Sequence, residues 1–187
     1  MTDAAFELAQ ARWHEVMRKV ASLMQKRELA AAIFELDAFL SDERQPELRS
    51  DALGFRADLK QELGQLDSAK DDLLQARALV GPSYGRYVSE LCLGRVCEAQ
   101  QRVDEAASWY RTALRTCAAG RGISGGTALS GFLELQYQES LTREDQTLVT
   151  DAALASWGVL DLPGKPDTTN WVSVVSAIKS AEAGKKR

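Results

Sequence analysis

Apolar and small side chains recur along this chain with the period of an amphipathic helix, and the pattern itself repeats. The repeated sets are Leu29, Ala32, Leu36 and Phe39; Leu66, Ala69, Leu73 and Ala76; and Val103, Ala106, Tyr110 and Ala113. Successive sets stand 37 residues apart (69 − 32 and 106 − 69). A repeat of this length with helical periodicity is typical of a stacked helical array, in which each helix pair buries its apolar face against the next.

Breaks between the apolar stretches divide the chain into helices. The pattern predicts helices over about 3–23 and 28–40, a pair on either side of Gly64 that ends near Val80, and a further pair over 84–99 and 103–117. Gly64 predicts the end of its helix, because glycine adopts the left-handed conformation without steric cost. Beyond the glycine-rich 120–131 segment, Thr142 predicts the cap of another helix, and a last helix follows Pro166.

These elements predict an all-α fold. We expect a single domain over 1–187, a right-handed α-solenoid of stacked antiparallel helix pairs that ends in a divergent capping helix. The clearest repeats cover 50–118, and the helical region over 127–183 diverges from them.

Bulk composition is that of an ordinary globular protein. Apolar residues make up 45% and charged residues 27% of 187 residues, and the net charge of −4 disfavours a dedicated nucleic-acid binder. The start of the chain has no signal-peptide pattern, and no window has the roughly 20 apolar residues of a membrane helix. Cys92, Cys97 and Cys117 form no CxxC motif. We therefore expect free thiols and a cytoplasmic protein without membrane partners.

The repeats resemble the tetratricopeptide repeat family. Leu93 and Gly94 match the family's Leu-Gly pair, and Ala57 stands where that glycine would be in the preceding unit. Gly64 matches the turn, and Ala69, Leu73, Ala76, Ala106, Tyr110, Ala113 and Leu114 match the second helix of each pair. The resemblance covers 50–118 and extends to 12–40. The family's spacing is about 34 residues, so the linkers here are expected to be longer, and Phe39 stands where a small residue belongs.

The resemblance implies that the first helices of successive pairs line a concave face that binds a peptide, helix or loop of a partner protein. The positions that the register places there are Asp51, Phe55, Asp58, Tyr84, Tyr87, Leu91 and Arg95. They do not form the lysine and asparagine clamp with which some members bind a C-terminal carboxylate. Tyrosine and arginine are common interface anchors, although Tyr84 and Tyr87 could equally pack inside the inter-repeat linker.

Catalytic and metal-binding patterns are weak. His14 is a lone histidine on a predicted helix, and the GxGxxG match at 120–125 follows a helix where a dinucleotide fingerprint needs a strand. Asp71 and Asp72 are interpreted as a solvated face, because adjacent helical side chains diverge by about 100°. We expect no enzyme, cofactor or metal site.

The expected function is therefore a non-catalytic protein-protein interaction module, an adaptor or scaffold. Three alternatives stay open at this point, and the last of them is an enzyme of unrecognised type. The first is an immunity-type or regulatory inhibitor that occludes a toxin or enzyme. The second is a structural scaffold that self-associates through an amphipathic terminal helix.

Overall fold

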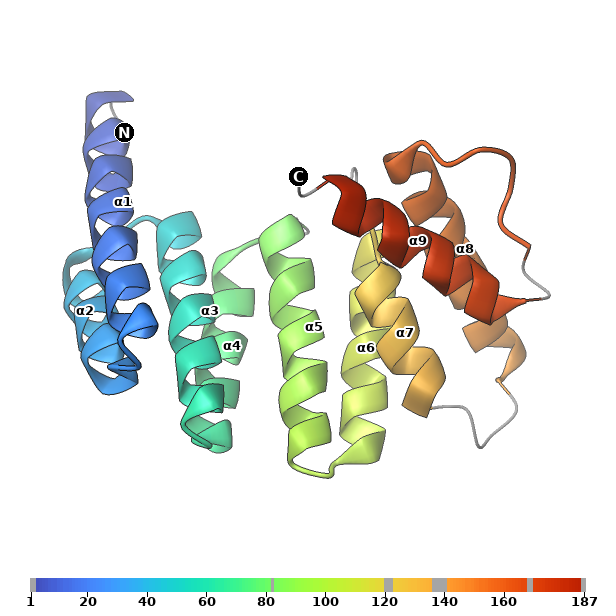
Figure 1. The fold of residues 1–187 in the computed structure, drawn as a ribbon, viewed down its shortest axis with the longest axis horizontal. Coiled ribbons are helices and arrows are strands. Elements are labelled where there is room, and N and C mark those ends of the chain that lie inside the picture. The colour runs from blue at the N-terminus through green and yellow to red at the C-terminus, as the bar shows by residue number, and fades with distance from the viewer. Residues whose placement is uncertain (1–2, 82, 120–122, 136–140, 168–169, 186–187) are drawn as a thin grey trace. The chain divides into compact units, whose positions relative to one another are not determined.

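Every element of the structure is a helix, within the residues that it describes. It is a computed structural model and describes residues 3–81, 83–119, 123–135, 141–167 and 170–185. The helices are α1 (Asp3–Gln25), α2 (Leu29–Asp42), α3 (Pro46–Glu62), α4 (Leu66–Leu79), α5 (Tyr84–Ala99), α6 (Val103–Ala119), α7 (Gly126–Leu135), α8 (Arg143–Leu160) and α9 (Trp171–Lys185). The expected all-α fold of antiparallel helix pairs is confirmed (Figure 1).

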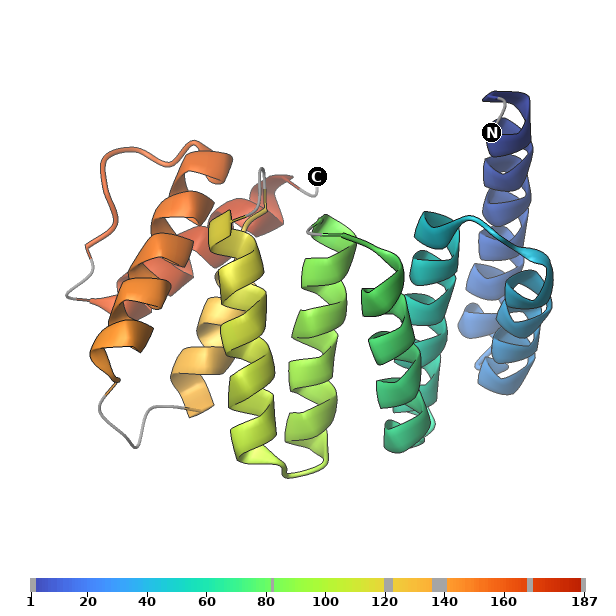
Figure 2. The ribbon, with the colours of Figure 1, turned by 180° about the vertical axis from the view of Figure 1, so that it is seen from behind.

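The chain divides into two compact units, residues 1–81 and 82–187. In the first unit α1 packs on α2, α2 on α3, and α3 on α4. In the second unit α5 packs on α6, while α7 and α8 both pack on α6, and α9 lies across α7 and α8 (Figures 1 and 2). Because the chain forms two compact units, the expectation of a single domain over 1–187 stays a prediction.

The turns between paired helices carry the 37-residue repeat. Arg27, Gly64 and Gln101 stand 37 residues apart, and each has a left-handed backbone, with φ of 61°, 74° and 61°. After each of them an amide bonds back five residues, as Gln65 N–H does to the carbonyl of Lys60 at 2.8 Å. This is the Schellman arrangement, which satisfies carbonyls at the end of the first helix. The predicted role of Gly64 is confirmed.

The sequence pattern predicts that Leu63 belongs to the buried stripe of its helix, that Asp67 or Ser68 caps the next helix, and that Pro46 lies in a loop, and all three predictions are wrong. Leu63 is exposed rather than buried, because α3 ends at Glu62 and Leu63 follows its last turn. Neither Asp67 nor Ser68 caps α4, which already begins at Leu66. Pro46 opens α3 rather than closing a loop, at a helical position whose N–H needs no partner.

The repeated small residues bring the paired helices close together. A Cβ added to Gly94 on α5 would lie 2.6 Å from Tyr110 Cε1, and one added to Gly131 on α7 would lie 2.8 Å from Tyr110 Cζ. The Tyr110 ring on α6 is therefore held between two glycines. One repeat earlier, Ala57 and Leu73 occupy the positions of Gly94 and Tyr110, and both are buried. Between these two repeats, the larger side chain on the second helix (Tyr110 rather than Leu73) therefore occurs with the smaller residue on the first helix (Gly94 rather than Ala57).

A buried ion-pair network joins three helices of the first unit. Asp72 on α4 accepts hydrogen bonds from Arg56 Nε and Nη2 at 2.8 and 2.6 Å, and Lys60 Nζ lies 2.7 Å from its Oδ2. Arg56 also pairs with Asp37 on α2. The interpretation of Asp72 as part of a solvated face is wrong: its side chain is 3% exposed, and it is paired because a buried carboxylate needs compensating charge.

A second ion pair ties α6 to α8. Arg111 donates to both carboxylate oxygens of Asp145, at 2.7 and 3.2 Å, and Arg115 pairs with Glu144 at 3.0 Å. These arginines bind the first turn of α8 rather than the end of their own helix. The predicted cap of α8 is confirmed, since Thr142 Oγ1 accepts from the Asp145 N–H at 3.1 Å. The hydrogen bonds from Arg111 lower the pKa of Asp145, against the effect of burial.

We predict that Gly94→Ala lowers the free energy of unfolding by about 1–3 kcal/mol, because its Cβ would overpack the Tyr110 ring. Adding Tyr110→Leu recreates the Ala57 and Leu73 combination and recovers part of the loss. Urea denaturation of the single and double variants measures this coupling. Gly54→Ala is the control, since a Cβ there meets nothing within 4 Å. Equal destabilisation by Gly94→Ala and Gly54→Ala would contradict this packing.

We also predict that Asp145→Asn destabilises the protein by about 1–3 kcal/mol at pH 7. The folded pKa of Asp145 is lowered, so its contribution is fully present above the unfolded pKa of about 3.9 and is lost as the pH falls through the folded value. The stability difference between the two proteins should therefore shrink as the pH falls below about 3.9. A stability difference that does not change between pH 7 and pH 3 would exclude the ion pair as its cause.

Candidate functional site

Three of the residues predicted to bind a partner lie together on the exposed face of α3. Asp51, Phe55 and Asp58 are all exposed, and Phe55 has 42% of its surface accessible. The Phe55 ring leans on Trp13 of α1, with 5.9 Å between ring centroids, and Trp13 in turn packs at 5.0 Å on the buried Phe39. This aromatic stack limits the movement of Phe55 while part of its ring remains in solvent. We call Asp51, Phe55 and Asp58 the α3 face.

The α3 face is acidic because the basic residues of α3 bind elsewhere. Arg56 and Lys60 pair with the buried Asp72, and Arg49 donates to the backbone carbonyls of Leu40 and Glu43 at 2.6 and 2.8 Å. Although Asp51 is exposed at the surface, neighbouring atoms partly desolvate its carboxylate, and this desolvation, followed by the charge of Glu47 one turn earlier, raises the pKa of Asp51 above its ordinary value. A raised pKa means that the carboxylate is under-compensated within the fold. A cation supplied by another molecule would therefore favour the ionised form of Asp51.

The predicted residues of α5 divide between surface and core. Tyr84, the first residue of α5, is 66% exposed, and Arg95 is also exposed. Tyr87 and Leu91 are buried in the core of the second unit, and burial raises the pKa of Tyr87 well above its usual range. Tyr87 and Leu91 therefore do not present their side chains to a partner in this conformation.

The start of α7 packs within the same core as Tyr87 and Leu91, which includes Ala128 and Leu129. Helix α9 in turn binds the start of α7, where Glu182 accepts from the Gly126 N–H at 3.2 Å and from the Ser124 hydroxyl. A Cβ on Gly126 would lie 2.6 Å from Ile178, so only glycine permits this approach. Tyr87 and Leu91 are therefore buried because α7 packs beside them, which cannot be predicted from the repeat register alone.

The sequence analysis missed a cavity between α7 and α9. Its volume is about 600 Å³, and its lining is mostly apolar, formed by Ser130, Leu133, Glu134, Leu141, Trp171, Val172, Val175, Ser176, Lys179 and Ser180. The cavity depends on how α9 crosses α7, which no local pattern specifies. The one available signal was Val172, an apolar residue that lies off the buried stripe of α9 and is 76% exposed.

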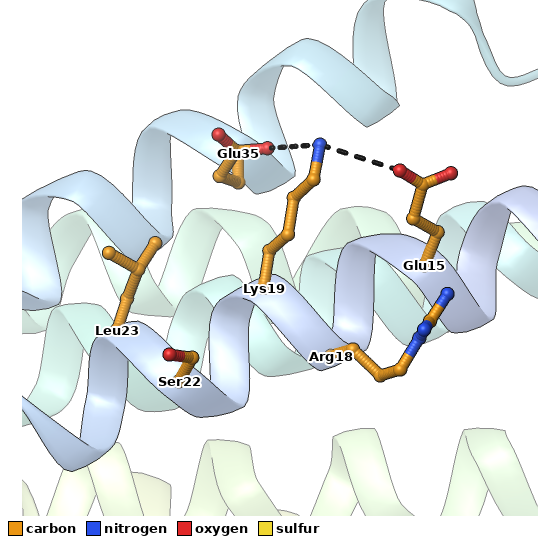
Figure 3. Close-up of a pocket in the computed structure, with 6 residues that line it drawn as sticks. All are labelled: Glu15, Arg18, Lys19, Ser22, Leu23 and Glu35. Carbon is orange, nitrogen blue, oxygen red and sulfur yellow. Dashed lines mark ion pairs between the residues drawn. The ribbon is translucent and has the colours of Figure 1, made fainter.

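A second depression, of about 470 Å³, lies between α1 and α2 and is lined by Glu15, Arg18, Lys19, Ser22, Leu23 and Glu35 (Figure 3). Lys19 stands between Glu15 and Glu35, with its Nζ 3.7 and 3.9 Å from their carboxylate oxygens. These side chains are partly exposed and already paired with one another. The depression is a shallow surface, wide open to solvent, around this group of ion pairs, and Leu23 is the one apolar residue among those that line it.

The weak catalytic patterns gain no partner groups in the structure. His14 is exposed on α1, and no three His, Cys, Asp or Glu side chains gather as a metal site would require among the residues described. Positions 120–122 of the GxGxxG match lie outside the described residues, as does Tyr137, which the sequence pattern assigns to the helix that follows the glycine-rich segment. At the end of that match, the Gly125 N–H donates to Ser156 Oγ at 2.8 Å within the fold. None of the described helices is both long and apolar enough to span a membrane.

Comparisons with known proteins identify a shared fold. No family model matches the chain, and no curated protein matches its sequence. The solved structure of BtubC (BKLC) from P. vanneervenii is similar at 14% identity over 95% of this chain and 82% of that chain, with a TM-score of 0.59. The solved structure of a Podosopora anserina protein described as a kinesin light chain with nearly identical TPR-like repeats is 16% identical in sequence. The alignment covers 91% of this chain and 94% of that chain, and the TM-score is 0.43. The likeness to BtubC (BKLC) is one of fold, and the tetratricopeptide-like resemblance rests on the repeated residues and turns of this chain.

Proposed function

We propose that this protein is a non-catalytic interaction module that binds a protein partner on the α3 face. One observation carries the proposal: the register positions of a partner-binding surface are exposed on α3, with an aromatic ring between two carboxylates. The equivalent region of α5 is largely core. Helical repeat folds of this class serve mainly as binding surfaces, which supports an interaction role without naming the partner.

The chemistry of the α3 face favours a basic segment with an apolar anchor. Phe55 is supported by Trp13, so it offers apolar contact area at little cost in side-chain entropy. Asp51 and Asp58 lie about one helical turn to either side of it and complement lysine or arginine side chains. The net charge of −4 acts in the same direction, since it attracts basic partners over a longer range.

The proposed location is the cytoplasm. Cys92, Cys97 and Cys117 are buried free thiols, and burial raises the pKa of Cys117, which keeps it unreactive. Such thiols suit a reducing compartment.

We predict that Phe55→Ala weakens partner binding at least about tenfold, which is the usual effect of removing a central aromatic anchor. Capture from the native lysate with wild-type and variant baits identifies the partner, and calorimetry with that purified partner measures the affinity. Asp51→Lys together with Asp58→Lys should slow association and reduce its dependence on salt.

The matched control is Phe34→Ala, which removes another exposed phenylalanine of the first unit, on α2. Circular dichroism of every bait establishes that the helices remain folded. If Phe34→Ala reduced affinity as much as Phe55→Ala, or if neither changed it, partner binding on the α3 face would be refuted.

A further inference from the structure

Helices α7 and α9 approach closely at one end and separate at the other. Gly126, at the start of α7, contacts Ile178 and Glu182 of α9, and Lys179 Nζ donates to Ser130 Oγ at 2.8 Å one turn further along α7. Toward the end of α7 and the start of α9 the two helices enclose the cavity of about 600 Å³. Figure 1 shows α9 lying obliquely across α7. The cavity therefore follows from the crossing of two helices that are fixed by polar bonds at their other ends.

The size and lining of this cavity suit a small molecule. Its volume falls within the about 300–1,000 Å³ typical of ligand pockets. Its apolar wall is formed by Leu133, Leu141, Trp171, Val172 and Val175. Val172 is 76% exposed, so a ligand that covers it gains apolar burial which the fold itself does not provide.

Lys179 is the cation of this lining. Its ammonium group has three N–H donors, and the structure shows one of them bonded to Ser130 Oγ. The Ser130 hydroxyl donates in turn to Glu134 Oε1 at 2.6 Å, so Glu134 is a carboxylate on the same wall. The remaining donors of Lys179 can bind an anionic group at the edge of the apolar wall, and Glu134 opposes that binding by its charge.

A hydrocarbon chain suits this wall better than an extended peptide does. Each peptide residue brings an N–H and a C=O group that need partners when buried. Among the lining residues, the polar side-chain groups are the hydroxyls of Ser130, Ser176 and Ser180, the indole N–H of Trp171, and the charged groups of Lys179 and Glu134, too few to pair the backbone of an extended peptide. An acyl chain brings no such groups along its length.

We propose that the cavity between α7 and α9 binds a single-chain amphiphilic carboxylate, with its hydrocarbon chain on the apolar wall and its carboxylate on Lys179. This site belongs to the second unit, and it is independent of the α3 face and of the proposed partner binding.

The experiment titrates the protein with decanoate, decan-1-ol and decyltrimethylammonium by calorimetry and tryptophan fluorescence, with the two ions below their micelle concentrations and the alcohol below its solubility limit. We expect saturable binding of decanoate at one site per chain, weaker binding of the alcohol and the weakest binding of the cation. Lys179→Gln should weaken decanoate binding about three- to tenfold and leave the alcohol unchanged. Glu134→Gln should strengthen decanoate binding about twofold, since it removes the opposing charge.

Two further variants separate the site from general effects. Lys165→Gln removes an exposed lysine between α8 and α9 and should change nothing. Val172→Glu places a charge on the exposed part of the wall and should weaken the binding of both decanoate and the alcohol, that of decanoate more strongly because the new carboxylate also repels it. Because Val172 is mostly exposed, this variant tests the wall with little demand on folding.

Three results would overturn the proposal. They are the absence of saturable binding, equal binding of all three amphiphiles, and equal effects of Lys179→Gln and Lys165→Gln. Sedimentation of the ligand-free protein tests whether a second copy of this chain occupies the cavity instead. A concentration-dependent dimer that Val172→Glu abolishes would identify the cavity as a dimer surface and would also overturn the ligand proposal.

Discussion

The second unit depends on the contact between the Tyr110 ring and the two glycines that enclose it. Gly94 on α5 and Gly131 on α7 leave room for the ring, so three helices meet around one side chain of α6. The phenol group reaches the edge of this core, where it donates to Glu98 Oε2 at 2.7 Å. A methyl group on either glycine would enter the space that the ring occupies, and close-packed interiors tolerate such additions poorly. The position of α7, and through it that of α9, follows from this packing.

Much of the fold could be predicted from the sequence because its signals are local. Helical periodicity located the helix pairs, the 37-residue spacing located their turns, and Thr142 marked the start of α8. The left-handed backbone at Arg27 and Gln101 was harder to predict, because arginine and glutamine rarely adopt this conformation. Both residues nevertheless lie in register with Gly64. The burial and pairing of Asp72 could not be predicted for a different reason. Its partners Arg56 and Lys60 come from another helix, so the sequence does not distinguish a buried aspartate from an exposed one beside it.

The candidate site could be predicted only in part, because the sequence shows which residues share a helix face but not which faces pack against other helices. Register assigns residues to one face of a helix, and on α3 that face is in solvent at Asp51, Phe55 and Asp58. Register does not say whether another helix covers the face, so Tyr87 and Leu91 were placed on a surface although they are core residues. The cavity between α7 and α9 was beyond the reach of sequence patterns, because it is created by a crossing of helices rather than by either helix.

The central claim is that the repeat position of Phe55 is exposed on α3, whereas its equivalent on α5, Cys92, is buried. Phe55 and Cys92 test it most directly, because they stand 37 residues apart and are 42% and 9% exposed. The measurement is the rate of thiol labelling in the native Phe55→Cys variant, compared with the wild-type protein. The account predicts one rapidly labelled thiol in the variant and none in the wild type, whose three cysteines are all buried. Rapid labelling of Cys92 at a rate similar to that of the introduced thiol would contradict it.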